Sequence, residues 1–186
     1  LTVAVDGSSY ARIPIRTRVG MPGDDLDAVV RDVAGELFPR AQAKQIDFGV
    51  EGEAGKTLVE GNPVLLREMF KNLIDNAIKY TPRGGSVTAR TLRQDGVPVV
   101  EVEDSGIGIP EADRERVFER FYRVLDSGED GSGLGLPIVR EIADLHGATV
   151  RLEDAPSGHG TLARVSFVHP GQRQAAFRSQ NRISWF

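Results

Sequence analysis

The chain of 186 residues contains 40% hydrophobic and 27% charged residues, no cysteine, and a formal net charge of −4. This composition is typical of one folded domain and excludes a wholly disordered chain, disulfides and thiol chemistry. Its apolar runs fall short of the roughly 18 residues that a membrane-spanning helix needs, and the negative charge argues against a nucleic-acid partner.

The two ends of the chain differ in composition from its middle. Residues 1–20 mix short apolar and basic patches without a clear period, so we predict a linker or an edge strand there. Residues 170–186 contain three arginines and no acidic residue, which indicates a mobile basic tail. The folded domain would then span residues 21–169.

Two long helices are predicted in the first half of the domain. Apolar residues recur at helical spacing over residues 24–44 and again after Asn62. Asp24 or Asp25 would cap the first helix, and Asn62 would cap the second, which opens with a proline. The second helix should end just before Pro82, because the residue before a proline avoids the helical conformation.

The remaining elements predict a sheet that packs against these helices. Strands are expected at residues 46–50, 86–92, 97–103, 149–152 and 162–168. The Asp95-Gly96 pair predicts a tight hairpin between the second and third of them. A short helix is expected within residues 114–121, and a third main helix over 136–145 should stop at Gly147. This order predicts an α+β two-layer sandwich with a mixed, mostly antiparallel sheet.

The second helix carries a stripe of polar residues away from its apolar face. Asn72 and Asn76 lie one turn apart, and Lys79 and Tyr80 continue the stripe. Amide oxygens on a rigid helix can hold a hard cation such as Mg²⁺, a lysine can neutralise phosphate, and a tyrosine can stack on a base. A solvated polar face would show the same pattern, so the stripe alone leaves both interpretations open.

A glycine-containing turn follows the third predicted strand. Asp104 ends the strand, and Gly106 and Gly108 would let the backbone approach a ligand closely. The Asp104 carboxylate could accept a hydrogen bond from the exocyclic amine of adenine. A tight turn with no ligand explains the same residues equally well.

A second glycine-rich segment opens the third helix. It comprises Gly131, Ser132, Gly133, Leu134, Gly135 and Leu136. Backbone N–H groups and the positive end of the helix dipole would suit a phosphate there. In the stretch before it, Phe118 and Phe121 could anchor a lid from which Arg120 or Arg123 faces phosphate. An amphipathic helix packed on the core is the alternative for that stretch.

Taken in order, these segments resemble a known set of motifs. Asn72–Tyr80, Asp104–Pro110, Val117–Tyr122 and Gly131–Leu136 are similar to the N, G1, F and G2 boxes of bacterial sensor histidine kinases. The resemblance covers about residues 26–167. It implies the GHKL ATP-binding fold, with three main helices and a mobile lid over ATP, and it identifies the domain as a catalytic one.

The resemblance also implies roles for individual residues. Asn76 would be the main Mg²⁺ ligand, with Asn72 beside the metal and the triphosphate. Lys79 would contact phosphate, Tyr80 would line the adenine and ribose side, and Asp104 would hydrogen-bond the adenine amine. Catalysis would rest on Asn72, Lys79 and a lid arginine. The other residues implied at the nucleotide or in the lid are Gly106, Gly108, Ile109, Phe118, Phe121, Arg123, Gly131, Ser132, Gly133, Leu134, Gly135 and Leu136.

By the same resemblance, the domain would donate the γ-phosphate of ATP to a histidine in two-component signal transduction. That histidine lies on a separate dimerisation and phosphoacceptor domain, and a response regulator acts downstream. His146, His159 and His169 do not resemble the acceptor motif. We therefore expect a monomeric fragment, the cytoplasmic domain of a sensor kinase anchored in the inner membrane.

Two alternatives stay open. The gyrase, mismatch-repair and anti-sigma kinase branches of the superfamily place a glutamate base where this chain has Asn72. Because an amide cannot act as a base, Asn72 argues against ATP hydrolysis and serine phosphorylation. Glu68, one turn earlier, is treated as a surface residue. An anti-sigma-type serine kinase and a non-catalytic nucleotide-binding regulatory module remain as alternatives.

Overall fold

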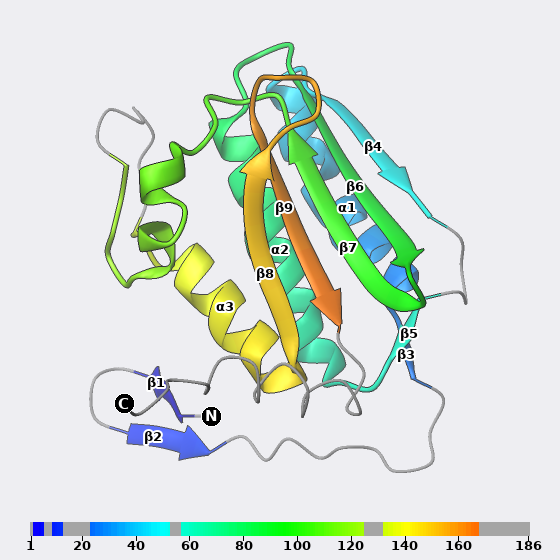
Figure 1. Cartoon of the computed structure of the whole chain (residues 1–186), viewed down its shortest axis with the longest axis vertical. Coiled ribbons are helices and arrows are strands. Elements are labelled where there is room, and N and C mark those ends of the chain that lie inside the picture. Colours follow the sequence, from blue (N-terminus) through cyan, green and yellow to red (C-terminus); the bar gives the residue numbers. More distant parts are fainter. Residues whose placement is uncertain (1, 6–8, 13–22, 53–56, 125–131, 168–186) are drawn as a thin grey trace, which may run out of the picture.

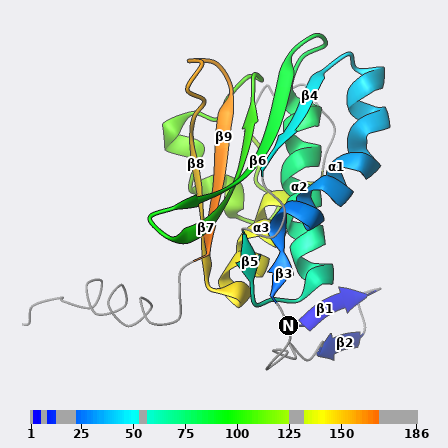
Figure 2. The same ribbon diagram turned by 90° about the vertical axis from the view of Figure 1, so that its right-hand side faces the viewer.

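The computed structural model describes residues 2–5, 9–12, 23–52, 57–124 and 132–167. Its main sheet has five strands in the order β4, β6, β7, β9, β8, of which only β4 runs parallel to its neighbour. The strands are β4 (Asp47–Glu51), β6 (Ser86–Gln94), β7 (Val97–Asp104), β8 (Ala148–Asp154) and β9 (Thr161–Phe167). The helices are α1 (Leu26–Ala43), α2 (Pro63–Tyr80) and α3 (Gly135–His146). The helices cover one face of the sheet (Figures 1 and 2), which confirms the predicted two-layer sandwich.

Four short strands complete the described structure. β3 (Asp24–Asp25) pairs with β5 (Leu58–Val59), and β1 (Thr2–Val5) pairs with β2 (Ser9–Arg12), both antiparallel. In the described part of the chain, β1 and β2 form a sheet of their own and do not extend the main sheet. The predicted domain boundaries stay predictions, and the predicted tail lies outside the described residues.

Local signals in the sequence fix where the helices begin and end. The Asp25 side chain accepts a hydrogen bond from the Asp27 N–H at 3.2 Å, so Asp25 is the cap of α1. Asn62 caps α2 by accepting from the N–H groups of Val64 and Leu65. Gly147 ends α3 at φ +63°, a left-handed conformation that suits glycine. These boundaries agree with the predicted ones.

The short helix predicted within residues 114–121 is present as a 3₁₀ helix, η2 (Arg116–Phe118), and a second 3₁₀ helix, η1 (Glu111–Asp113), precedes it. The backbone becomes extended at Glu119 and left-handed at Phe121, with φ +66°. Phe121 donates its N–H to the carbonyl of Gly133 at 3.0 Å. A continuing helix would direct that N–H toward its own preceding turn instead.

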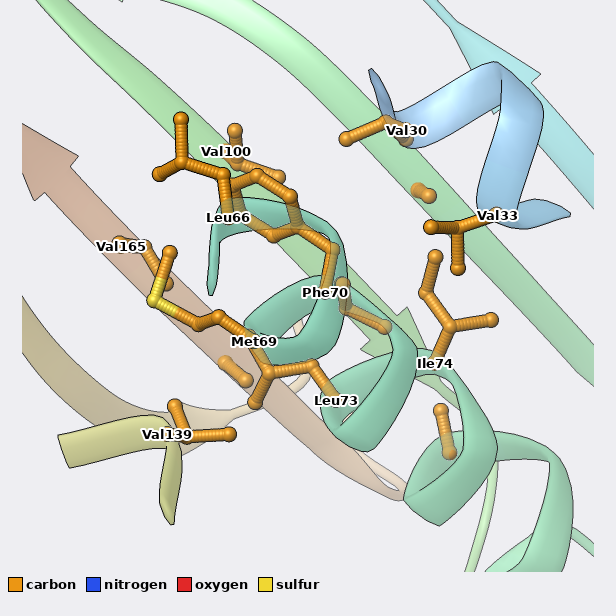
Figure 3. Close-up of a cluster of buried hydrophobic side chains, with 14 of the residues drawn as sticks. Val30, Val33, Leu66, Met69, Phe70, Leu73, Ile74, Val100, Val139 and Val165 are labelled. Carbon is orange, nitrogen blue, oxygen red and sulfur yellow. The ribbon is translucent and has the colours of Figure 1, made fainter. Parts of the chain in front are cut away.

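The core is built around the apolar face of α2 (Figure 3). This face lies between α1, the inner side of the sheet and α3. The labelled core side chains are Val30, Val33, Leu66, Met69, Phe70, Leu73, Ile74, Val100, Val139 and Val165. Because one face of α2 is fully buried, its half-buried opposite stripe is held in a fixed orientation.

A histidine joins the end of α3 to the start of α2. His146 Nε2 accepts a hydrogen bond from the Asn62 N–H at 3.0 Å, and Nδ1 lies 2.7 Å from the Ile142 carbonyl oxygen. The Asn62 donor therefore fixes the tautomer, with the proton on Nδ1. A Cβ at Gly61 would lie 2.8 Å from the imidazole ring, so this glycine makes room for it. The antiparallel pairing that results also brings the end of α2 beside the start of α3.

We expect His146→Leu to lower the free energy of unfolding by about 1–3 kcal/mol, because the Asn62 N–H loses its acceptor at the cap of α2. Urea denaturation measures the change. His159→Leu is the matched control, because His159 is exposed in the turn between β8 and β9. Equal urea midpoints for the two variants would contradict the expected role of His146.

Candidate functional site

A cavity of about 360 Å³ opens where the end of α2, the end of β7 and the start of α3 meet. Most of the residues singled out in the sequence share its wall, although they come from four separate segments. They are Asn72, Asn76, Lys79, Tyr80, Asp104, Gly108, Ile109, Arg123, Ser132, Gly133, Gly135 and Leu136. The fold thus converts motifs far apart in the sequence into one site.

Two side-chain amides of α2 face the first residue of α3. The Nδ2 group of Asn72 donates to the Glu68 carbonyl oxygen and to Glu68 Oε1, both at 2.9 Å. A Cβ at Gly135 would lie 3.2 Å from Asn72 Oδ1 and 3.2 Å from Asn76 Nδ2. The absence of a side chain at Gly135 therefore leaves space in front of both amides.

Asp104 presents a carboxyl group at the other side of the cavity. Its Oδ1 accepts from the N–H of Gly106 at 2.8 Å and from the N–H of Thr161 at 3.2 Å. Burial raises the pKa of Asp104, against the opposing effect of these two hydrogen bonds. Both hydrogen bonds that the described residues make to this carboxyl group use Oδ1, so Oδ2 could accept from a ligand.

The two glycines after Asp104 differ in what surrounds them. A Cβ at Gly106 would lie 2.6 Å from the Tyr80 carbonyl oxygen, so Gly106 lets the turn pack against the end of α2. It does not line the cavity, whereas Gly108, at φ +73°, does. Gly108 thus stands where the backbone approaches the cavity, in a conformation that suits glycine.

The phenylalanines of the predicted lid anchor also lie off the cavity wall, as does Leu134. Phe118 is buried in the core, with the Arg140 guanidinium 3.8 Å from its ring centroid. The side chain of Phe121 is 73% exposed and does not pack as an anchor would. Tyr122 lines the cavity instead, and its hydroxyl donates to Asp113 Oδ1 at 2.5 Å.

The described residues include only the two ends of the predicted lid. Gly131 and the stretch from residue 125 lie outside them. At the near side of that stretch, Arg123 lines the cavity. At its far side, Ser132 and Gly133 lead into the N-terminus of α3, whose N–H groups and dipole favour an anion.

Several residues of the wall were missed by the sequence-based prediction. Asp75 and Arg40 form an ion pair between α2 and α1 at the rim. Asp75 lies three positions after Asn72 and four before Lys79 on α2, a spacing that could have indicated its place. The residues contributed by the sheet, Val102, Leu152, Thr161 and Ala163, follow only from strand register and have no motif.

The donor set fits a particular kind of ligand. The cavity wall combines a hydrogen-bond acceptor, the Asp104 carboxyl, with two amides, Lys79 and a helix N-terminus. Among the described residues, no group of three or more His, Cys, Asp or Glu side chains could hold a metal ion. A cation here would rely on amide oxygens and on a ligand's own oxygens, as Mg²⁺ does with substrate phosphates.

The chain is similar to a large set of known proteins. A family model described as histidine kinase-, DNA gyrase B-, and HSP90-like ATPase matches residues 61–171. The adaptive-response sensory kinase SasA of Synechococcus sp. (strain JA-3-3Ab) is 38% identical over 130 residues, covering 69% of this chain and 34% of SasA. The sensor protein kinase PmrB of Pseudomonas aeruginosa is 37% identical over 143 residues, covering 76% of this chain and 29% of PmrB. The chain thus spans about a third of the length of these relatives.

Solved structures agree with the sequence comparison. The mycobacterial sensor histidine kinase MprB superposes with a TM-score of 0.70 at 33% identity, covering 80% of this chain and 97% of that one. Full-length ShkA, solved in complex with AMPPNP, superposes with a TM-score of 0.69 at 26% identity, covering 84% of this chain and 31% of that one. The predicted GHKL-type fold is confirmed. In the part of the chain that the structure describes, no helix has the length and apolar character needed to cross a membrane.

Proposed function

Because the chain belongs to the family of histidine kinase-, DNA gyrase B- and HSP90-like ATPases, we propose that it binds Mg-ATP and donates the γ-phosphate to a histidine on a separate domain. One observation carries this proposal. The Asp104 carboxyl, the Asn72 and Asn76 amides and the N-terminus of α3 share one cavity. The sensor kinases among its relatives support the same assignment.

Each part of the cavity has a role in the proposal. Asp104 Oδ2 accepts from the exocyclic amine of adenine, and Tyr80 lines the base and ribose side. Asn76 and Asn72 hold the cation through their amide oxygens, and Lys79 neutralises phosphate charge. The N–H groups at the start of α3 contact the phosphates. When bound, Mg-ATP supplies the phosphoryl group, and the metal neutralises its charge.

Because an asparagine stands at position 72, the site has no general base there, and this favours a histidine as the phosphate acceptor. Phosphoryl transfer depends mainly on positioning and charge neutralisation, and an imidazole is nucleophilic without deprotonation by the enzyme. A serine acceptor would need a base. Glu68 does not line the cavity, and its carboxylate accepts a hydrogen bond from Asn72. We therefore propose a histidine acceptor over a serine acceptor or a purely regulatory module.

The rest of the proposal concerns the longer protein. We propose that the acceptor histidine lies on a dimerisation domain and that a response regulator receives the phosphate. The domain would then be the cytoplasmic, catalytic part of a membrane-anchored sensor kinase, monomeric when isolated. Arg123 and the lid segment that follows it would contact the phosphates.

Phosphotransfer to a supplied acceptor tests the proposed function. The domain is incubated with γ-labelled ATP and the phosphoacceptor domain of the full-length protein. We expect a labelled product that is lost in acid and survives base, as phosphohistidine does. A base-labile, acid-stable product would support a serine kinase instead. Nucleotide binding with no transfer to this acceptor would support a non-catalytic module.

Asn76→Ala tests the proposed metal ligand. We expect the affinity for AMP-PNP in the presence of Mg²⁺ to fall by roughly 100-fold, about 2.7 kcal/mol, because the amide oxygen beside the metal is removed. Calorimetric titration with and without Mg²⁺ measures the change, and urea denaturation checks that the variant folds. Unchanged Mg²⁺-dependent binding by a folded variant would refute the role of Asn76.

A further inference from the structure

We infer that Glu68 is a positioning residue for the proposed metal site, because it holds the Asn72 amide with its oxygen directed into the cavity. This inference rests on the proposed function, since it concerns how a ligand of the proposed cation is oriented. Glu68 contacts neither the cavity nor the nucleotide site directly. It acts through Asn72, which lies one turn further along α2.

The orientation of the amide follows from its partners. The two N–H bonds of Asn72 Nδ2 are directed at two acceptors of Glu68, its carbonyl oxygen and Oε1, each 2.9 Å away. A flipped amide would place Asn72 Oδ1 against both oxygens and leave no donor between them. Glu68 therefore excludes the flipped state. Oδ1 is left facing the space in front of Gly135.

The ion pairs of the neighbouring cations leave the Glu68 carboxylate to accept from Asn72. Arg67 and Lys71 flank it on α2, and Lys71 stands at a spacing that usually pairs with a glutamate. Lys71 attracts the Glu68 carboxylate through space, but the ion pairs of both cations are made across the helix interface. Lys71 Nζ lies 2.5 Å from Glu36 Oε1, and Arg67 pairs with Asp32 and Glu36 of α1. The Glu68 carboxylate accordingly accepts from Asn72.

An outer carboxylate of this kind does two things to a metal ligand. It fixes the ligand's orientation, and its negative charge makes the ligand oxygen a better donor to the metal. Loss of such a partner commonly weakens metal affinity by 10- to 100-fold. We expect the lower end of that range here, because the Glu68 backbone carbonyl remains as one acceptor in any variant.

Three variants distinguish the effect of Glu68 on the Asn72 orientation from the effect of its charge and from the effect of changing any surface glutamate. Glu68→Met keeps length and helix propensity but removes the side-chain acceptor. Glu68→Gln keeps an acceptor oxygen and removes the charge. Glu60→Met is the matched control, because Glu60 is exposed just before α2. Each is titrated calorimetrically with AMP-PNP in Mg²⁺ and in EDTA.

We expect Glu68→Met to lower the affinity in Mg²⁺ roughly tenfold and to leave the affinity in EDTA unchanged. Glu68→Gln should recover most of the loss, and Glu60→Met should match the wild type in both buffers. A structural role alone would lower both affinities and the urea midpoint together. Equal Mg²⁺-dependent affinity in Glu68→Met and the wild type would overturn the inference.

A second readout needs no nucleotide. In ¹⁵N-labelled protein, the two Asn72 side-chain amide protons should resonate as a well-separated pair that exchanges slowly with solvent in the wild type, and in Glu68→Met the separation should narrow and the exchange should become faster. An identical pair in both proteins would also overturn the inference. Failure of the proposed function has a different signature, because the wild type itself would then show no Mg²⁺-dependent binding.

Discussion

Asp104→Asn is expected to change the base preference of the cavity from adenine toward hypoxanthine. In the wild type, Asp104 Oδ1 is engaged by the N–H groups of Gly106 and Thr161. An asparagine keeps these bonds only by placing its oxygen there, so its NH₂ group takes the place of Oδ2. That donor would face the amine of adenine, whereas hypoxanthine presents a carbonyl oxygen at the same position.

We expect the variant to lose about 100-fold or more in ATP affinity, because the asparagine NH₂ group and the adenine amine are both donors and would face each other in a partly buried site. Calorimetry with ATP and inosine triphosphate measures both affinities. The wild type should prefer ATP, and Asp104→Asn should bind inosine triphosphate at least as well as ATP. A variant that keeps the wild-type preference would contradict the assignment of Asp104 to the base.

The same substitution should stabilise the domain without ligand. Burial raises the pKa of the Asp104 carboxyl, so the folded domain holds this proton more tightly than the unfolded chain does. The stabilisation from proton binding is therefore present below the ordinary carboxyl pKa of about 3.9 and is lost as pH rises through the raised value. At pH 7 the folded domain carries a buried charge that an asparagine lacks.

We expect the urea midpoint of Asp104→Asn to exceed that of the wild type at pH 7, and the difference to shrink as pH falls through the raised pKa of Asp104 and to level off below about 4. Asp95→Asn is the control. It makes the same chemical change at the tip of the β6–β7 hairpin, where φ is +51° and an asparagine is well tolerated. A lower midpoint for Asp104→Asn at pH 7 would refute the proposed cost of burying the charge.

Gly135→Ala is expected to remove nucleotide binding while the fold remains intact. The added Cβ would lie 3.2 Å from Asn72 Oδ1 and 3.2 Å from Asn76 Nδ2, closer than ordinary contacts. The methyl group would fill the space in front of both amides and displace them. Because the methyl group would take the space that the proposed cation and phosphates need, we expect Mg-AMP-PNP affinity to fall by roughly 100-fold, about 2.7 kcal/mol.

Gly35→Ala provides the matched control for this prediction. Gly35 lies within α1 and is exposed, and a Cβ added to it would meet no neighbouring group within 4 Å. This variant should gain about 0.5–1 kcal/mol of stability from helix propensity and bind nucleotide as the wild type does. Wild-type affinity in Gly135→Ala would show that the space before the amides is not used.

Features of the fold that depend on residues close in the sequence were predictable, whereas features that depend on residues far apart in the sequence were not. The caps at Asp25 and Asn62 and the Asp95-Gly96 turn depend on neighbours within a few residues, so these boundaries were predictable. The short helix within residues 114–121 was predictable as well, but its end at Phe118 was not, because the bond from Phe121 to Gly133 overrides the helical pattern.

The residues of the candidate site also fall into those with a local sequence motif and those placed by contacts between distant segments. Glycine and asparagine motifs predicted most of the cavity wall. Thr161 had no such signal, although its N–H supports the Asp104 carboxyl across 57 positions of sequence. That contact requires the pairing register of β7 and β9, which aligns Glu103 with Leu162. The predicted metal, partners and lid contacts remain proposals.

The hydrogen bond from the Phe121 N–H to the Gly133 carbonyl bears on how this protein could tolerate changes in length. It joins two points twelve positions apart in the sequence, so the two ends of the segment between them are held at one place. Doubling the length of a loop with fixed ends costs only about 0.6 kcal/mol in closure entropy. Insertions between Val124 and Ser132 should therefore leave the core's stability nearly unchanged, whereas Tyr122 and Val124 pack against the core. Related proteins could therefore differ in the length and sequence of this segment, and in its contacts to a bound phosphate chain, without changes in the rest of the domain.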